Sequence, residues 1–112
     1  MLVLFDHGTP APIRSFLEGH LVKRTQDLKW DRLTNGELLG AAEESGFDVF
    51  LTTDKNIRYQ QDLSGRKIAI IVLGNAQWPV LKLHVQRVVD AVSAAKPGSY
   101  CEVDIPDALP GK

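Results

Sequence analysis

The amino-acid sequence predicts an α/β fold, a three-layer sandwich around a mostly parallel central sheet. Two continuous apolar runs, at residues 2–5 and 68–73, suit strands that are buried on both faces. Helical patterns come between the predicted strands, and this alternation implies right-handed crossovers between parallel strands. Because 112 residues are enough for one hydrophobic core but too few for two, we expect one domain at residues 1–105 and an irregular tail at 106–112.

The composition narrows the class of protein. Hydrophobic residues make up 44% of the chain and charged residues 24%, which indicates neither disorder nor a membrane protein. The 13 basic and 14 acidic side chains give a net charge of -1, so contact with nucleic acid would require a local basic cluster. Cys101 is the single cysteine and cannot form an internal disulfide, and the opening apolar run is too short for a signal peptide. We therefore expect a cytoplasmic protein that makes no membrane contact.

The first elements are a strand and a helix. Residues 2–5 form the first predicted strand. Thr9 can then cap a helix that has Pro10 at its first position, and this helix is expected to end before Gly19. A short second strand is expected at residues 20–25.

The middle of the chain carries the clearest local signals. Residues 34–37 read Thr-Asn-Gly-Glu, a capping box, and predict a helix that begins here and ends at Gly46. Residues 47–53 are rich in β-branched and aromatic side chains and lead directly into Asp54, which indicates a strand. The apolar run at 68–73 is the next strand.

The last third of the chain predicts a long helix and an edge strand. Pro79 opens the helix and Pro97 closes it. Its apolar stripe consists of Val80, Leu81, Val85, Val88, Val89 and Val92. Residues 100–105 alternate enough to form a final strand at the edge of the sheet.

Two acids follow predicted strands. Asp6 comes after the first apolar run, and Asp54 comes after the strand at 47–53. In parallel sheets ligands bind beyond the carboxyl ends of the strands, so neighbouring strands would bring both acids to one edge. Clustered carboxylates repel each other, and a hard cation such as Mg²⁺ or Mn²⁺ keeps them ionised together. Aspartate also commonly forms turns and caps after strands, and spacing alone favours neither interpretation.

Glu37 has two interpretations. As the last residue of the capping box it can hydrogen-bond back to the helix start and have no other role. As an acid near the predicted sheet edge it is also a candidate metal ligand and catalytic residue beside Asp6 and Asp54. The capping interpretation is favoured by the motif alone.

Three further side chains are candidates for substrate binding. Lys55 and Arg58 lie close to the proposed edge, where they would hold phosphates. A solvated charged face is the simpler interpretation, because the net charge is not basic. Asn75 follows the strand at 68–73 and would bind metal-bound water, although Gly-Asn is also a common turn pair.

Three segments together resemble a known family. They are Leu-Val-Leu-Phe-Asp at 2–6, Asn-Gly-Glu-Leu-Leu-Gly-Ala-Ala at 35–42 and Phe-Leu-Thr-Thr-Asp-Lys-Asn at 50–56. The chain resembles the PIN-like family of small bacterial proteins related to toxin nucleases. The resemblance spans roughly residues 2–95, and the Thr-x-Asp-Lys segment is its most specific part.

The resemblance implies a function and a set of ligands. Asp6 and Asp54 match two metal-binding acids of the family, whereas Asn35 stands where a third acid is usual and Glu37 is the nearest substitute. The implied activity is a Mg²⁺- or Mn²⁺-dependent endoribonuclease acting on RNA. Such proteins are often the toxin that an antitoxin protein neutralises, and they are frequently homodimers.

Two alternative functions remain open. The first is a catalytically inactive PIN-like module that binds RNA or a partner protein through the same edge. The second is a receiver-type phosphoacceptor, since that fold also places acids after early strands. The second is disfavoured because Asp6 has no second acid beside it and Lys82 lies within the predicted long helix.

Overall fold

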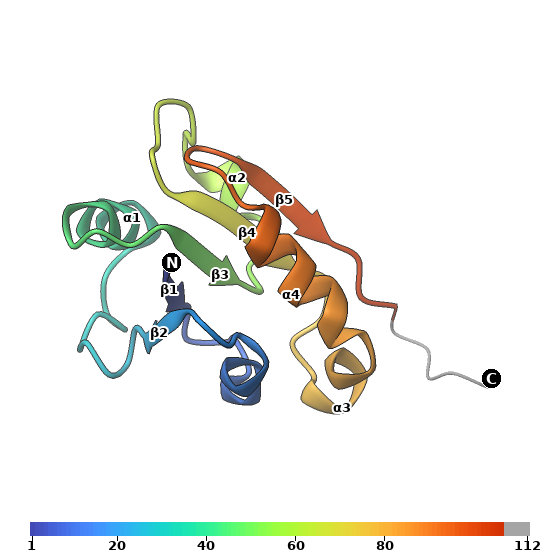
Figure 1. The fold of residues 1–112 in the computed structure, drawn as a ribbon. Coiled ribbons are helices and arrows are strands. Elements are labelled where there is room, and N and C mark those ends of the chain that lie inside the picture. The colour runs from blue at the N-terminus through green and yellow to red at the C-terminus, as the bar shows by residue number, and fades with distance from the viewer. Residues whose placement is uncertain (107–112) are drawn as a thin grey trace.

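The sheet and its helices form three layers. The computed structural model describes residues 1–106, and a five-stranded sheet in the order β2-β1-β3-β4-β5 lies between two helical layers (Figure 1). Every pair of neighbouring strands in it is parallel. The predicted three-layer α/β sandwich is therefore confirmed, and its architecture is consistent with a PIN-like fold.

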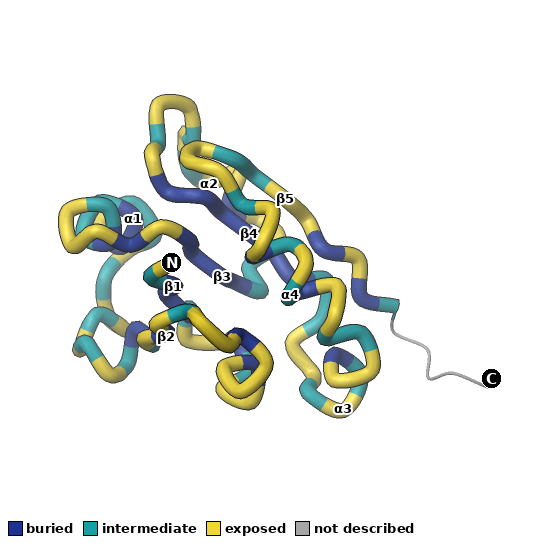
Figure 2. Tube along the Cα trace, in the orientation of Figure 1, coloured by how far each residue is buried: buried dark blue, intermediate teal, exposed yellow. Residues whose placement is uncertain are grey.

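Each observed strand lies within a predicted range. The strands are β1 (Leu2–Phe5), β2 (Leu21–Arg24), β3 (Val49–Thr52), β4 (Ala69–Leu73) and β5 (Tyr100–Val103). β3 and β4 are buried along their whole length, as expected for central strands covered on both faces. β2 and β5 are the two edges of the sheet. Figure 2 shows the central strands as buried and the outer loops as exposed.

The helices divide between the two faces of the sheet. One face carries α1 (Asn35–Glu44) and the four-residue α2 (Ile57–Gln60). The opposite face carries η1 (Ala11–Phe16), α3 (Trp78–Leu81), η2 (Lys82–His84) and α4 (Val85–Ala94). α1 begins with the predicted capping box, in which Thr34 and Glu37 exchange hydrogen bonds.

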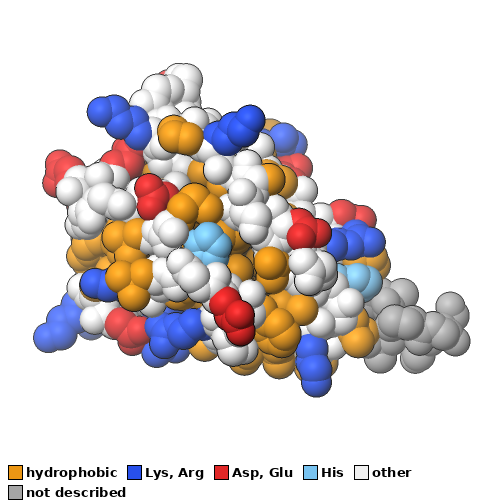
Figure 3. Space-filling model, in the orientation of Figure 1, with side chains coloured by type: hydrophobic (Ala, Val, Ile, Leu, Met, Phe, Trp, Pro, Cys, Tyr) orange, Lys and Arg blue, Asp and Glu red, His pale blue; other side chains and the backbone are white. Residues whose placement is uncertain are grey.

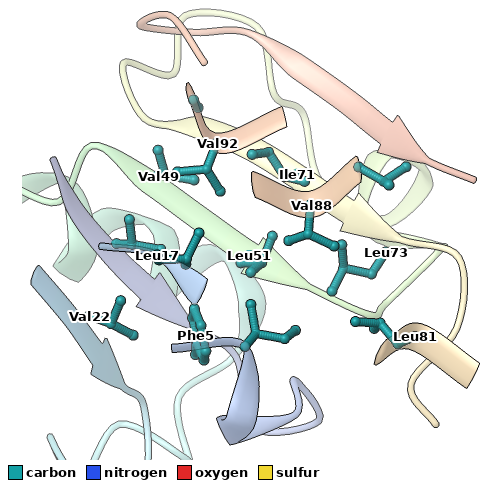
Figure 4. Close-up of a cluster of buried hydrophobic side chains, with 14 of the residues drawn as sticks. Phe5, Leu17, Val22, Val49, Leu51, Ile71, Leu73, Leu81, Val88 and Val92 are labelled. Atoms are coloured by element: carbon teal, nitrogen blue, oxygen red, sulfur yellow. The ribbon is translucent and has the colours of Figure 1, made fainter. Parts of the chain in front are cut away.

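The alternation of side chains along each strand builds two cores. Phe5, Leu51 and Ile71 point to the same face as Val88 and Val92 of α4 (Figure 4). Their chain neighbours in the strands, including Leu4, Phe50 and Ile70, pack against α1 and α2 on the other face. Burying each such large side chain stabilises the fold by roughly 1.5–3 kcal/mol. The sheet is therefore a rigid support for the loops at its carboxyl edge.

The helix after β1 differs from the prediction. It is a 3-10 helix whose cap residue is Pro10, and Thr9 does not cap it. The buried hydroxyl of Thr9 instead donates a 2.9 Å hydrogen bond to the carbonyl oxygen of Leu51. This contact gives the buried Thr9 hydroxyl a hydrogen-bond partner on β3 instead of on the helix. It also fixes the loop that follows Asp6.

The predicted long helix is divided. The backbone leaves the helical conformation at His84, where φ is −124° and ψ is 19°, and the chain changes direction between α3 and α4 (Figure 1). α3 brings Leu81 to the core, and α4 brings Val88 and Val92. Of the other residues in the predicted stripe, Val80 and Val89 pack against the same core while partly buried, and Val85 is half-buried. The prediction of one continuous helix was wrong, because the backbone breaks at His84.

The surface carries mixed charge. On the face shown in Figure 3, basic and acidic side chains are interspersed. Among residues 1–106 no helix is long and apolar enough to cross a membrane. Except for Pro106, the tail expected at 106–112 lies outside the described residues.

Candidate functional site

Asp6 and Asp54 lie at the carboxyl ends of neighbouring strands. β1 pairs with β3 in parallel, with Phe5 opposite Leu51, and the amide nitrogen of Asp6 donates to the carbonyl oxygen of Leu51 at 2.9 Å. β2 lies on the other side of β1, so the connections from β1 and β3 diverge at this point. Ligands of open α/β sheets bind in the crevice at such a switch point.

A buried hydroxyl joins the two acids. The side chain of Thr52, which is 0% exposed, donates a 2.7 Å hydrogen bond to Oδ2 of Asp6. The hydroxyl oxygen of Thr52 also accepts a 3.0 Å hydrogen bond from the backbone nitrogen of Asp54. Asp6 and the backbone that carries Asp54 are therefore held to one fixed point at the end of β3.

Thr52 was not identified as a site residue from the sequence. It is the first residue of the Thr-x-Asp-Lys segment, which was the most specific part of the family resemblance. Its role depends on the register between β1 and β3, which places the Thr52 side chain beside Asp6. Local sequence does not contain that register.

Asn35 completes the contacts of Asp54. Its Nδ2 donates a 3.2 Å hydrogen bond to Oδ2 of Asp54 and a 3.3 Å hydrogen bond to Oε1 of Gln60. The other carboxylate oxygen of Asp54 accepts a 3.0 Å hydrogen bond from the backbone nitrogen of Asn56. Asn35 is the first residue of α1, and the positive end of that helix dipole favours an anion at Asp54.

Glu37 has its carboxylate on the helix cap. Oε1 of Glu37 accepts a 3.0 Å hydrogen bond from the backbone nitrogen of Thr34, and the Thr34 hydroxyl accepts one from Glu37 at 3.3 Å. The backbone hydrogen bond from Thr34 and the contact with its hydroxyl lower the pKa of Glu37. The capping role that the motif favoured is the one the structure has.

The three acids do not form one ligand set. Within residues 1–106, no three side chains of the His, Cys, Asp and Glu types group together in a way that could hold a metal ion. The structure brings Asp6 and Asp54 to Thr52 and brings Asn35, instead of Glu37, to Asp54. The acidic pair and the Asn35 amide are thus the assembled part of the site.

This smaller set has donors that suit a hard cation. Mg²⁺ binds through oxygen ligands and often uses only one or two protein carboxylates together with waters and substrate phosphates. Asp6 and Asp54 supply two half-buried carboxylates. The Asn35 amide lies against Asp54 through its nitrogen, and its oxygen would become a third donor if the amide turned over. The residues fit Mg²⁺ or Mn²⁺ in donor type and in charge.

The predicted substrate-binding residues lie in three different settings. Lys55 is exposed and lines a groove of about 320 Å³ whose other lining residues are Val72, Gly74, Glu102, Val103 and Asp104. Arg58 turns toward Glu102, with Nε 3.7 Å from its Oε2. Asn75 accepts a 2.7 Å hydrogen bond from the backbone nitrogen of Gln77 and so forms a turn before α3. Of the three, Lys55 is the cation next to Asp54 in the chain.

A larger hollow lies at the amino ends of the strands, opposite the end that carries the acids. It has a volume of about 400 Å³ and includes Met1, Asp48 and Lys67 in its lining. These residues precede β1, β3 and β4, so they are at the amino ends of the strands. Size alone therefore does not mark the edge where the acids gather.

The fold and the candidate site can be described together. The chain is a parallel α/β sandwich with an acidic pair and an amide at the switch point between β1 and β3. Comparisons with protein-family models, with curated proteins and with solved structures found no match. The argument for function therefore rests on the residues of this chain.

Proposed function

We propose that the protein is a Mg²⁺- or Mn²⁺-dependent endoribonuclease of the PIN-like type. The observation that carries the proposal is the Thr52 hydroxyl, which ties Asp6 to the backbone of Asp54 at the switch point of the sheet. A buried polar group that orients one carboxylate and fixes the backbone of a second acid in advance is the kind of support that a metal-dependent active site requires. Asp54 also makes a turn contact with the backbone of Asn56, and the link through Thr52 is the contact that two separate turn formers would lack.

Each residue has a distinct role in the proposed mechanism. Asp6 and Asp54 would hold the cation, with Asn35 as a neutral third donor. The bound ion would supply Lewis acidity toward a phosphodiester and would activate a water for attack. Lys55, exposed beside Asp54, would bind a phosphate of the RNA strand and so position it at the acids.

Cleavage of RNA in the presence of Mn²⁺ tests the proposal. We expect the wild-type protein to cut RNA with Mn²⁺ and to lose this activity in EDTA. Asp6→Asn and Asp54→Asn should each reduce cleavage at least a hundredfold, because each removes one of two charged ligands. Asp90→Asn is the matched control, since Asp90 is an exposed acid of α4 on the other helical layer. Equal cleavage by Asp54→Asn and Asp90→Asn would refute the proposal.

A catalytically inactive module is the second candidate, and Asn35 favours it. The amide replaces a charge at the position where the family usually has an acid, and it donates a hydrogen bond to Asp54. A site with fewer carboxylates binds a divalent ion more weakly. An inactive module would show no rise in melting temperature with Mn²⁺, whereas a ligand that binds the folded state raises it.

A receiver-type phosphoacceptor has less support, although its fold has the same strand order. The order 2-1-3-4-5 is shared by receiver proteins, and Asp54 follows β3. However, His7 is the residue next to Asp6, and residues 104–106 after β5 contain no lysine. Lys82 is exposed in η2 on the α4 side of the sheet. Stable labelling of Asp54 by a small phosphodonor would revive this candidate.

The cellular setting in the proposal comes from the resemblance. We propose a cytoplasmic protein that acts as the toxin of a toxin–antitoxin pair and forms a homodimer. Growth arrest on expression, relieved by Asp54→Asn, would support the toxin role. Light scattering of the purified protein would test the homodimer directly.

A further inference from the structure

Tyr59 is exposed to a degree that the core does not explain. Its side chain is 72% exposed, more than the other exposed large hydrophobic residues of the described chain. It lies on α2, directly after the segment that carries Asp54 and Lys55. Burying so little of the ring contributes little to stability, so the position of Tyr59 calls for another explanation.

Arg58 is held against this ring. Its guanidinium carbon lies 4.7 Å from the centroid of the Tyr59 ring and 6.0 Å from that of Tyr100. Nη2 of Arg58 donates a 2.6 Å hydrogen bond to the Tyr59 hydroxyl. Glu102 anchors the group, since it accepts a 2.8 Å hydrogen bond from Tyr100 and lies 3.7 Å from Nε of Arg58. We call Arg58, Tyr59 and Tyr100 the Tyr59 platform.

The platform is connected to the acidic site. Gln60 of α2 accepts a hydrogen bond from Asn35, the residue that contacts Asp54. On the other side, the groove of about 320 Å³ is lined by Lys55 and by Glu102, the anchor of the platform. A polynucleotide with one phosphate at Lys55 would therefore pass along this groove toward Glu102, where the platform begins.

We propose that the Tyr59 platform is a stacking subsite for one unpaired nucleobase of the RNA. Tyrosine rings and arginine guanidinium planes are the surfaces on which unstacked bases pack in RNA-binding proteins. The hydrogen bond and the ion pair hold Arg58 in place before RNA arrives, which lowers the cost of ordering the side chain. The inference deepens the proposed ribonuclease function and depends on it for the position of the phosphate.

Binding without cleavage tests the subsite. The probes are a fluorescein-labelled oligoadenylate of about eight nucleotides and an abasic oligomer with the same number of phosphates, both in EDTA. We expect wild-type protein to bind the oligoadenylate about tenfold more tightly than the abasic oligomer, because stacking requires bases. Tyr59→Ala should remove this preference, and Tyr59→Phe, which keeps the ring, should retain most of it.

Leu83→Ala is the matched control, because Leu83 is an exposed apolar residue of η2 on the other helical layer. Unchanged melting temperatures are expected for Tyr59→Ala and Leu83→Ala. Equal binding of the two oligomers by wild-type protein, or no measurable binding of either, overturns the inference. An unchanged preference in Tyr59→Ala overturns it as well.

Failure of this inference can be told apart from failure of the proposed function. Suppose the base preference depends on Tyr59 but the protein does not cleave RNA with Mn²⁺. This result would refute the proposed nuclease activity and would leave the stacking subsite supported. Suppose cleavage depends on Asp54 but Tyr59→Ala has no effect on binding. This result would refute the stacking subsite and would leave the proposed nuclease activity supported. If the platform bound a protein instead of RNA, Tyr59→Ala would leave RNA binding unchanged, which is the result that refutes the subsite.

Discussion

The hydroxyl of Thr52 lies 2.7 Å from Oδ2 of Asp6 and donates a hydrogen bond to it from the neighbouring strand. Because Thr52 is fully buried and Asp6 is half-buried, this bond is partly shielded from water and is stronger than one made at the surface. The hydroxyl also accepts from the backbone of Asp54. One side chain thus couples the stability of the sheet edge to the geometry of the candidate site.

Thr52→Val tests this coupling. Valine keeps the shape of threonine but leaves Oδ2 of Asp6 and the nitrogen of Asp54 without this partner. We expect a loss of roughly 1–3 kcal/mol in the free energy of unfolding, together with a weaker response to Mn²⁺. Urea denaturation and the melting temperature with and without Mn²⁺ are the measurements. Thr52→Ser, which keeps the hydroxyl, should retain the Mn²⁺ response, and a full response in Thr52→Val would contradict the role of the bridge.

Asn35→Asp should have opposite effects with and without metal. In EDTA the new carboxylate faces Asp54, repels it and no longer donates the hydrogen bond that Asn35 makes. The melting temperature should fall by several degrees. With Mn²⁺ the added charge strengthens the site, so the metal-induced rise should exceed that of the wild type.

Asn75→Asp is the control for Asn35→Asp. It adds the same charge in the turn after β4, where the side-chain oxygen would still accept from Gln77. Its response to Mn²⁺ should match that of the wild type. An identical response in all three proteins would argue against a metal at Asp54.

The strands and the two acids were predictable because their signals are local. β1 and β4 are unbroken apolar runs that end in polar or glycine residues, and such runs indicate buried strands wherever they occur. Parallel pairing then brings Asp6 and Asp54 to the same edge. These steps need only the order of residues along the chain.

Other features depend on contacts between distant segments. α2 has four residues and one buried side chain, Ile57, so it has no helical period to detect. The turn at His84 follows from the packing of α3 and α4 on the sheet, which a valine stripe does not encode. The role of Thr52 depends on the register of β1 against β3. Local pattern and tertiary contact thus account for different parts of the site.

Glu37→Gln separates capping from metal binding. Glutamine can still accept the hydrogen bond from Thr34, so helix α1 should form normally and the melting temperature should change little. If Asp6, Asp54 and Asn35 hold the ion, the Mn²⁺-induced rise and the cleavage rate should also remain near those of the wild type. A loss of cleavage comparable to that of Asp54→Asn would instead assign Glu37 to the metal.

Glu43 connects α1 to β4. Its carboxylate accepts hydrogen bonds from Nη1 of Arg66 at 2.7 Å and from the backbone nitrogens of Lys67 and Ile68. Burial raises the pKa of Glu43, but the hydrogen bonds from Arg66, Lys67 and Ile68 outweigh it, and the pKa lies below its ordinary value of 4.5. Glu43 and Arg66 are only 20% and 25% exposed, so solvent screens this pair less than a surface pair.

The lowered pKa sets the sign of a pH dependence. As the pH falls, the unfolded chain takes up the Glu43 proton before the folded chain does, so the contribution is present above about 4.5 and is lost as the pH falls through the lower, folded value. Glu43→Gln should therefore cost roughly 1–3 kcal/mol near neutral pH and progressively less below 4.5. Urea denaturation across this range measures the difference, with Glu44→Gln, its exposed neighbour on α1, as the control. A difference between wild type and Glu43→Gln that stays constant with pH would show that the charge of Glu43 contributes nothing to stability.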